Sequence, residues 1–290
     1  MERIDFTNWK ASKVQYGGAD EKIGVLFCNE RYILKFKKKT LYGEAYNDIS
    51  EYIGCKVFKE LGFNVQETFL GIYNKRKVVA CKDFCVNGAK LKPFADVGES
   101  SVEDGKYFYT FEDVKKLIYE SKRFPDNERE NVIKHFWDTY IVDCLLANSD
   151  RHSKNWGYLK VDDYYEIAPI FDNGNCLFSG LVDEEEIKDI QCSEDELMER
   201  VKVYPKSMIS IDKKEGSSYY DVITSKSFED CNEAIKRIFP KIELAKINRI
   251  IDSINEKDLS KNRKQFLKTI IKLRYELILK KTYEDLICQK

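Results

Sequence analysis

The chain has 290 residues, of which 43% are apolar and 13% aromatic, so it can bury a large core and does not have the composition of a disordered protein. Its 49 basic and 50 acidic side chains nearly cancel, which excludes a strong overall attraction to nucleic acid or to an anionic membrane. The N-terminus lacks a secretory signal pattern, and no apolar run approaches the ~20 residues of a membrane span. We therefore expect a cytoplasmic protein with nine reduced cysteines, and neither nucleic acid nor membrane as a direct partner.

The N-terminal segment contains two predicted strands joined by a glycine turn. Val14–Tyr16 and Ile23–Phe27 flank Gly17 and Gly18, a pattern that predicts a β-hairpin. Glycines there permit positive φ and a close approach of backbone N–H groups to phosphate, and Lys22 would add positive charge. Taken alone, however, two adjacent glycines indicate only a turn.

The next predicted strand and the helix after it each carry a charged residue with two possible roles, Lys35 and Glu51. In the predicted strand Arg31–Phe36 alternate residues share a face, so Lys35 lies with Ile33. This lysine is either a solvent-facing edge residue or one held inward to bind phosphate. The periodicity of Asn47–Leu61 predicts a helix, on which Glu51 is either a solvated charge or the partner of an inward lysine.

Two more strands, Val65–Ile72 and Lys77–Phe84, complete the β-rich part of the chain. The residues that follow have the composition of a connector. We therefore expect a small antiparallel sheet lobe over 1–85 and a mainly helical lobe over 86–290. The cleft between two such lobes is a preferred ligand site.

The second part is predicted to be mainly helical, because its apolar residues recur at intervals of three and four. Pro240 is expected in the first turn of its helix. The predicted helices are Phe111–Ile118, Asn127–Ala147, Phe228–Phe239, Pro240–Ile254 and Ser260–Lys281.

A hairpin is predicted to bring two polar residues to the same place. If its turn has two residues, Val161 pairs with Tyr164, and continued pairing sets Asn155 opposite Ile170. Asn155 and Asp172 would then arrive at one end of the hairpin.

These residues have the chemistry of phosphoryl transfer. Asn155 and Asp172 offer oxygen ligands for Mg²⁺, which typically takes one or two protein carboxylates and completes its shell with phosphate and water. Asp150, five residues before Asn155, would orient an acceptor hydroxyl. His152 and Lys154 are further candidates; His152 is either a structural hydrogen-bonding residue or a group that stabilises transition-state charge.

Together these segments resemble the HipA-like serine/threonine kinases, whose fold is related to that of phosphatidylinositol 3- and 4-kinases. The resemblance covers most of the first 175 residues. The chain looks more like the short stand-alone members of the family, since it begins almost at the phosphate-binding loop. The segments that carry it are Asn148–Asn155 with Phe171-Asp172, Gly17–Lys22, Lys35, Ser50–Tyr52 and Val78–Phe84.

The resemblance implies an α+β, two-lobed protein-kinase-like fold with ATP between the lobes. It also implies autophosphorylation, for which Ser12 and Tyr16 beside the glycine turn are candidates. The hinge departs from the Arg-Phe-Asp-Arg type common in the family, so its contacts are placed only to within a residue or two. The implied ATP-binding residues are Gly17, Gly18, Lys22, Lys35, Glu51, Lys82, Asp83 and Phe84.

The sequence thus predicts an ATP- and Mg²⁺-dependent kinase acting on serine or threonine in a protein substrate. Two alternatives stay open: a lipid or small-molecule kinase, and a non-catalytic nucleotide-binding module. The acidic stretches 183–186 and 193–196 favour basic substrate segments, or are simply solvated surface. An antitoxin or other regulator cannot be identified from the sequence.

Overall fold

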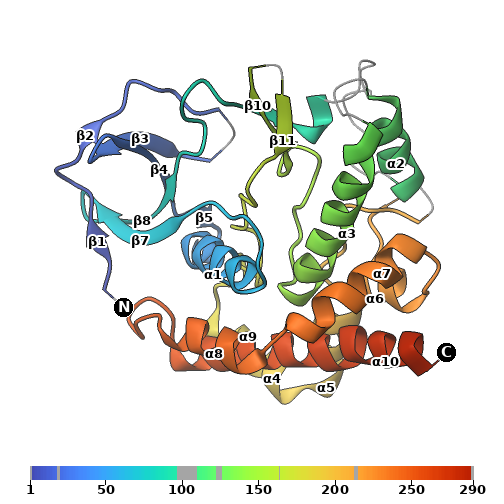
Figure 1. Cartoon of the computed structure of the whole chain (residues 1–290). Helices are drawn as coiled ribbons and strands as arrows, with labels where there is room; N and C mark the ends of the chain where they lie inside the picture. Colours follow the sequence, from blue (N-terminus) through green and yellow to red (C-terminus); the bar gives the residue numbers. More distant parts are fainter. Residues whose placement is uncertain are drawn as a thin grey trace.

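The chain folds into a curved sheet followed by a mainly helical part, so the fold class is α+β, as predicted (Figure 1). The protein is described by a computed structural model. Its described residues are 2–17, 20–96, 110–121, 126–162, 164–211 and 215–288.

The described residues form one six-stranded sheet in which each face packs against a different element. In β4, Leu34 and Phe36 point to a small core that the N-terminal Phe6 covers. Ile33 and Lys35 point to the opposite face, against helix α1. The sheet order is β1-β7-β8-β4-β3-β2, with bounds β1 Ile4–Asp5, β2 Lys10–Ala11, β3 Lys22–Phe27, β4 Glu30–Phe36, β7 Thr68–Tyr73 and β8 Arg76–Lys82.

Helix α1, Asn47–Glu60, is buried on almost every side. It packs on β7 and β8 on one side and on α8 on the other, so it connects the sheet to the helical part. The chain leaves it through Gly62, whose φ of +88° is a conformation that favours glycine. The predicted helix is confirmed.

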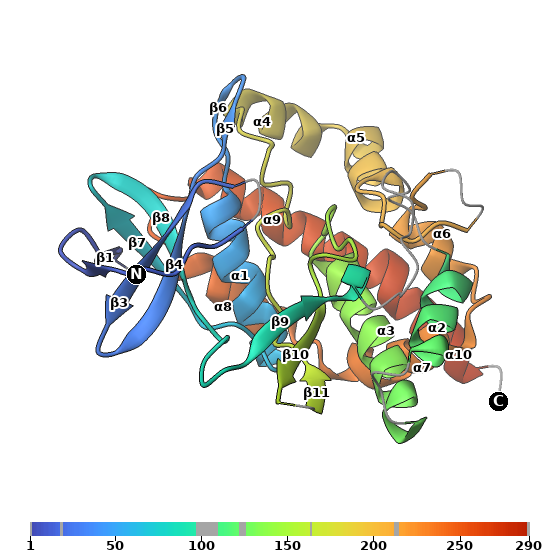
Figure 2. The same ribbon diagram turned by 90° about the horizontal axis from the view of Figure 1, so that it is seen from above.

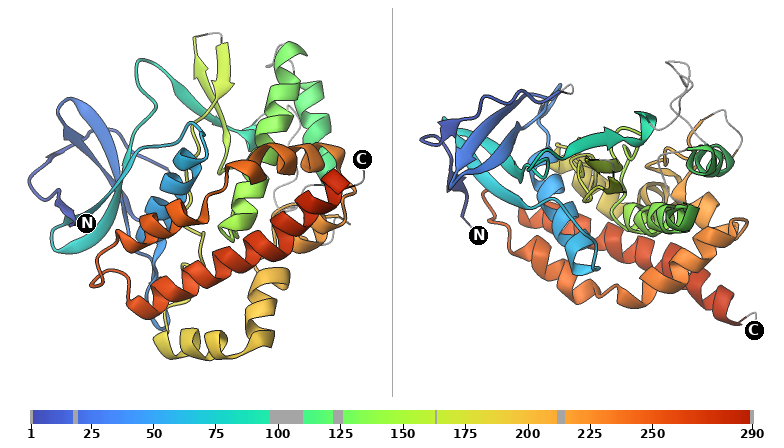
Figure 3. Two further views of the ribbon diagram at one scale, coloured as in Figure 1. Left: turned by 60° about the horizontal axis from the view of Figure 1, so that its bottom comes forward. Right: turned by 45° about the horizontal axis from the view of Figure 1, so that its top comes forward.

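The second part of the chain also contains a three-stranded sheet of order β11-β10-β9. Helices α9 and α10, joined by a π-helical segment, form one long rod that runs beneath both parts of the molecule (Figure 3). The remaining bounds are β5 Lys39–Thr40, β6 Gly43–Glu44, β9 Lys90–Pro93, α2 Phe111–Glu120, α3 Arg129–Leu145, β10 Gly157–Val161, β11 Tyr164–Ile167, α4 Glu184–Cys192, α5 Glu194–Met198, α6 Tyr219–Thr224, α7 Glu229–Ile238, α8 Leu244–Asp252, α9 Lys261–Arg274 and α10 Lys281–Cys288.

Two predicted elements, the strand Val14–Tyr16 and the helix Pro240–Ile254, differ from the structure. The strand predicted at Val14–Tyr16 is wrong: β3 pairs instead with β2, at Lys10–Ala11, and the described residues between these two strands lie outside any strand. The helix predicted from Pro240 begins only at Leu244, because Pro240 lies in a separate single 3-10 turn.

The hairpin register is confirmed where it was predicted from the turn, but not beyond. Val161 pairs with Tyr164, and the ladder continues to Tyr158 and Ile167. The expected pairing of Asn155 with Ile170 is wrong, because Ile170 instead bridges to Val65 beside the first sheet. The segment that follows β11 thus crosses to the N-terminal part of the chain.

Two further features concern the state of the thiols and the apolar length of the helices. The nine cysteines are all free thiols, and five of them are buried. Across the described ranges, no helix combines the length and the apolar character needed to cross a membrane.

Candidate active site

A lysine of the first sheet lies between two carboxylates from different parts of the chain. Lys35 Nζ is 3.0 Å from Glu51 Oε2 on α1 and 2.9 Å from Asp172 Oδ1, beyond the β10–β11 hairpin. The Glu51 side chain is 1% exposed, and its second oxygen accepts a hydrogen bond from the backbone N–H of Asn173. Of the two placements that the sequence allows for Lys35, the structure therefore has the inward one.

Electrostatics keep this group charged. Burial of the ammonium would lower the pKa of Lys35, but the charges of Glu51 and Asp172 outweigh burial and hold the pKa well above its usual value. Burial would likewise raise the pKa of Asp172, but Lys35 lowers it below its usual value. Two carboxylates share one ammonium, so the group has a net negative charge. Because the Asp172 side chain is still 37% exposed, it can bind a cation.

Arg151 joins the loop before β10 to the loop after β11. Its guanidinium forms a two-pronged ion pair with Asp143 at the end of α3, with N–O distances of 2.9 and 3.0 Å. It also donates hydrogen bonds to the carbonyl oxygens of Asn155 and Phe171, and to the side chain of Asn173. A planar donor fork suits such simultaneous contacts. Arg151 therefore holds Asn155 and the residues around Asp172 in one constellation.

Asp150 projects from the same loop and is steadied by amide donors. Asn175 Nδ2 is 2.5 Å from Asp150 Oδ2, and Asn155 Nδ2 donates to the Asp150 carbonyl oxygen at 2.8 Å. His152 Nε2 is 3.7 Å from Asp150 Oδ1. Lys154 is exposed, and its backbone N–H donates to His152 Nδ1. The carboxylate of Asp150 is thus oriented but partly open to solvent.

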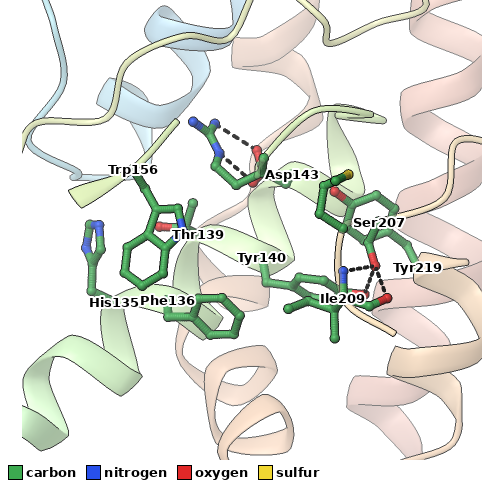
Figure 4. Close-up of a pocket in the computed structure, with 11 residues that line it drawn as sticks. His135, Phe136, Thr139, Tyr140, Asp143, Trp156, Ser207, Ile209 and Tyr219 are labelled. Carbon is green, nitrogen blue, oxygen red and sulfur yellow. Dashed lines mark hydrogen bonds and ion pairs between the residues drawn. The ribbon is translucent and has the colours of Figure 1, made fainter. Parts of the chain in front are cut away.

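Behind the loop lies a pocket whose lining includes several aromatic side chains. Figure 4 shows Asp143 at its edge, with Trp156 on one side and Tyr219 on the other. Asp143 accepts a further hydrogen bond from Asn148, whose carbonyl oxygen accepts one from Tyr219. Burial lowers the pKa of His135, at the far side of this pocket, to about 4, so that it is neutral at physiological pH.

The hinge is tied to the segment that precedes the glycine turn. Asp83 accepts a 2.9 Å hydrogen bond from the Tyr16 hydroxyl and forms a 2.9 Å ion pair with Arg31. Burial and this hydrogen bond raise the pKa of Tyr16. The Phe84 ring lies 5.7 Å from the ring of Phe171, the residue before Asp172, measured between centroids. The Asp83–Phe84 segment, where the hinge is expected, therefore contacts both the segment that carries Tyr16 and the loop that carries Asp172.

Of the remaining predicted ATP-binding residues, Lys22 pairs with Lys35 in the β3–β4 ladder, whereas the Lys82 side chain lies on the other face of the sheet. Lys22 Nζ donates to the carbonyl oxygen of Gly17 at 2.7 Å, while Gly18 lies outside the described residues. Lys82 is in ion-pair contact with Glu30 on the sheet face opposite to Lys35. A ligand beside Lys35 would therefore meet only the backbone of Lys82.

Sequence reasoning passed over three residues that organise the site. Arg151 lay inside the recognised motif without a role, although an arginine next to Asp150 is a visible signal. The sequence alone assigns no role to Asn173 or Asn175. Both follow Asp172 closely, but their partners come from elsewhere in the chain, so the spacing alone does not reveal them.

We expect Lys35→Met to lower the free energy of unfolding at pH 7 by about 3–5 kcal/mol, because Glu51 is left charged and buried without its partner. The lowered pKa of Asp172 stabilises the native protein above the unfolded pKa, about 3.9, and this stabilisation disappears as the pH falls through the native value. The difference between wild type and variant should therefore narrow in acid. Urea unfolding followed by circular dichroism measures both effects.

The double variant Lys35→Met/Glu51→Gln is the matched control. It removes the unpaired charge but keeps an acceptor for the backbone N–H of Asn173. It should recover most of the loss. A single variant as stable as wild type would contradict the assignment of this ion group as a structural link.

Comparison with known proteins places this geometry in a family. The model of the HipA-like C-terminal domain matches residues 14–257. The serine/threonine-protein kinase CtkA of Helicobacter pylori strain J99 is 36% identical over 296 residues, covering 96% of this chain and 87% of that protein. The crystal structure of a Helicobacter pylori proinflammatory kinase CtkA has a TM-score of 0.90 at 34% identity, covering 99% of both chains.

A more distant structure shares the fold alone. A chain from the HipA, HipB and operator DNA complex of the Shewanella oneidensis MR-1 toxin–antitoxin system has a TM-score of 0.52 at 14% identity, covering 93% of this chain and 67% of that chain. The family model spans far more than half of the chain, and the 36% identical relative aligns over nearly all of it. The chain therefore belongs to the family of HipA-like C-terminal domains.

Proposed function

We propose that this protein is an ATP- and Mg²⁺-dependent kinase that phosphorylates serine or threonine in a protein substrate. The observation that carries the proposal is the convergence of the Lys35–Glu51 pair with Asp172 and, through Arg151, with the loop that bears Asp150. The relative that is 36% identical is named a serine/threonine-protein kinase, which supports the same acceptor class here.

The residues beside Lys35 fit a magnesium nucleotide. Lys35 would hold phosphate oxygens, with Glu51 keeping its ammonium in place. Asp172 and Asn155 would hold Mg²⁺, a hard cation that prefers oxygen ligands. When bound, MgATP supplies the phosphoryl group and the metal charge that stabilises its transfer. We place the boundary between the two lobes, and hence the nucleotide, near residue 85.

The two ends of the nucleotide would meet different backbone segments. Gly17 and Gly18 would cover the phosphates, with Lys22 adding charge beside them. Asp83 and Phe84 would form the hinge against which the base packs. The contact of Phe84 with the residue before the metal-binding loop supports this arrangement.

Asp150 would accept or orient the proton of the acceptor hydroxyl. Its carboxylate is held by Asn175 on one oxygen, while the other faces His152 at 3.7 Å. Positioning of this kind accounts for most of the catalysis in phosphoryl transfer, since little covalent chemistry is left to the protein. His152 and Lys154 would steady negative charge at the entrance.

We extend the proposal to autophosphorylation near the glycine turn. Tyr16 donates its hydroxyl hydrogen bond to Asp83, so a phosphate on Tyr16 would remove that bond and face the carboxylate. Ser12, whose hydroxyl accepts from the backbone of Val14, is the other candidate. Mass spectrometry after incubation with MgATP that finds both residues unmodified would remove this extension.

We expect Asp150→Ala and Asp172→Ala each to lower phosphoryl transfer from MgATP to a protein acceptor by about 100-fold or more. Asp150→Ala should keep its affinity for MgATP, because the residue contacts the acceptor side. Asp172→Ala should weaken the Mg²⁺-dependent part of nucleotide binding. Radiolabel transfer and calorimetry measure these effects, with the exposed, remote Glu256→Ala as the charge-matched control.

The alternatives give different results in the same experiment. Transfer to inositol lipid or a small alcohol, but never to protein, would support a kinase of another specificity. Tight MgATP binding without turnover on any acceptor would identify a non-catalytic module.

Asn175 provides a separate test as a positioning residue. We expect Asn175→Ala to lower kcat by about 10–100-fold with little change in the KM for ATP, because it releases the Asp150 carboxylate but not the metal. Asn175→Asp should be worse, since two carboxylates would then repel each other. If the fall in kcat were accompanied by a loss of thermal stability, Asn175 would instead be a merely structural residue.

A further inference from the structure

A pocket of about 340 Å³ opens beside the catalytic loop. One wall comes from the segment of β5 in the N-terminal part and the other from the residues that follow Asp172. It reaches Ser149 and Asn175, which adjoin Asp150 in sequence and by hydrogen bond respectively. Whatever enters this pocket therefore lies next to the residue that would orient the acceptor hydroxyl.

The walls of the pocket are held in place by buried contacts. The backbone N–H of Lys38 donates to the buried Asn47 side chain, and that of Tyr46 donates to the Ser179 carbonyl oxygen. From α9, the buried Arg263 donates to the Phe178 carbonyl oxygen, and its guanidinium lies 3.9 Å from the centre of the Tyr46 ring. The pocket is thus preformed across both parts of the chain.

The charge of the pocket is positive. Among its described lining residues the ionisable side chains are Lys38 and Lys39, and no carboxylate joins them. Lys38 pairs with Asp20 at 3.2 Å, but both side chains are about one-third exposed, and such pairs contribute little and exchange easily. Lys38 also lies close enough to Asp172 to lower the pKa of that residue.

Apolar surface continues from the lysines. The turn between β5 and β6 exposes Leu41 and Tyr42, which are 96% and 83% accessible. In Figure 2 this hairpin lies beside α4, and a Cβ at its Gly43 would lie 3.9 Å from Cγ2 of Val182, just before that helix. Adjacent exposed apolar residues beside an open pocket are typical of an interaction surface.

The acidic stretches 183–186 and 193–196 could attract basic substrate segments, but two of their side chains already bind other residues of the chain. Glu184 on α4 accepts hydrogen bonds from Ser260 and Asn262 of the C-terminal helices. Glu185 pairs with Lys188 within the same helix. Among the described residues that line the pocket beside Asp150, the charged side chains are therefore the lysine pair and not those of the acidic helices.

We propose that this pocket is an acceptor subsite that selects protein segments with an anionic side chain near the phosphorylated serine or threonine. Aspartate, glutamate and an existing phosphoserine share the required chemistry, since each offers oxygen acceptors to the ammonium groups of Lys38 and Lys39. Leu41 and Tyr42 add apolar contact to the same segment. The proposal rests on the protein kinase function proposed above.

The test uses the full chain with MgATP and peptides that carry one threonine acceptor in a neutral background. Each flanking position holds in turn alanine, aspartate, phosphoserine or lysine. We expect aspartate or phosphoserine at one position to raise kcat/KM by about tenfold over alanine, which corresponds to about 1.4 kcal/mol from charge-assisted hydrogen bonds to the lysines. A gain with both residues indicates general acidic recognition, whereas a gain with phosphoserine alone indicates recognition of primed substrates.

Charge reversal separates the subsite from the nucleotide site. Lys39→Glu should abolish the preference for anionic peptides and favour the lysine peptides, with the KM for ATP unchanged within about twofold. Lys75→Glu, on the exposed β7–β8 turn, is the charge-matched control and should keep the preference.

The outcomes distinguish failure of the subsite from failure of the kinase assignment. Transfer that depends on Asp150 but treats all peptides alike, or favours lysine peptides in wild type, overturns the subsite and leaves the kinase function standing. Loss of ATP affinity in Lys39→Glu would assign the lysines to the nucleotide and also overturn it. No transfer to any peptide or protein would overturn both.

Discussion

A buried ammonium group needs negative partners, and this requirement links the two parts of the molecule. Lys35 comes from the sheet, Glu51 from α1 and Asp172 from the loop beyond the β10–β11 hairpin. α1 and that loop also approach so closely that a Cβ at Gly54 would lie 2.6 Å from the Cβ of Asn173, which only glycine avoids. The position of the loop that carries Asp172 is therefore coupled to the position of Lys35.

Arg151 plays the corresponding part for the loop that carries Asp150. Its charge is balanced by Asp143 at the end of α3, and its remaining donors bind the backbone on both sides of the site. A rigid helix thereby positions residues that lie on loops, which is the arrangement that precise chemistry requires. Aromatic side chains behind Asp143 complete the support. The site thus depends on two ion groups, one for each loop.

Much of this could be predicted from local patterns in the sequence. Strand alternation put Lys35 on the face of Ile33, and the two-residue turn gave the Val161–Tyr164 register, because both depend on neighbouring residues only. The pairing of Asn155 with Ile170 failed because Ile170 bridges to Val65, a contact set by the tertiary fold.

The other features that the sequence did not predict, β2 and the role of Asn175, also depend on contacts with distant parts of the chain. The short strand β2 is defined by its pairing with β3 and not by its own residues, which contain no β-branched run. Asn175 acts on Asp150 from 25 positions away, so no spacing rule identifies it. Residues whose role is to hold another residue are found only when both partners are seen.

The central claim is that Lys35, Glu51 and Asp172 form the binding site of a magnesium nucleotide beside Asp150. A crystal structure with Mg²⁺ and a non-hydrolysable ATP analogue tests it most directly. The account predicts Lys35 on the phosphates and still paired with Glu51, with Asp172 and Asn155 on the metal ion. A nucleotide bound elsewhere, or a metal ion held by other side chains, would contradict it.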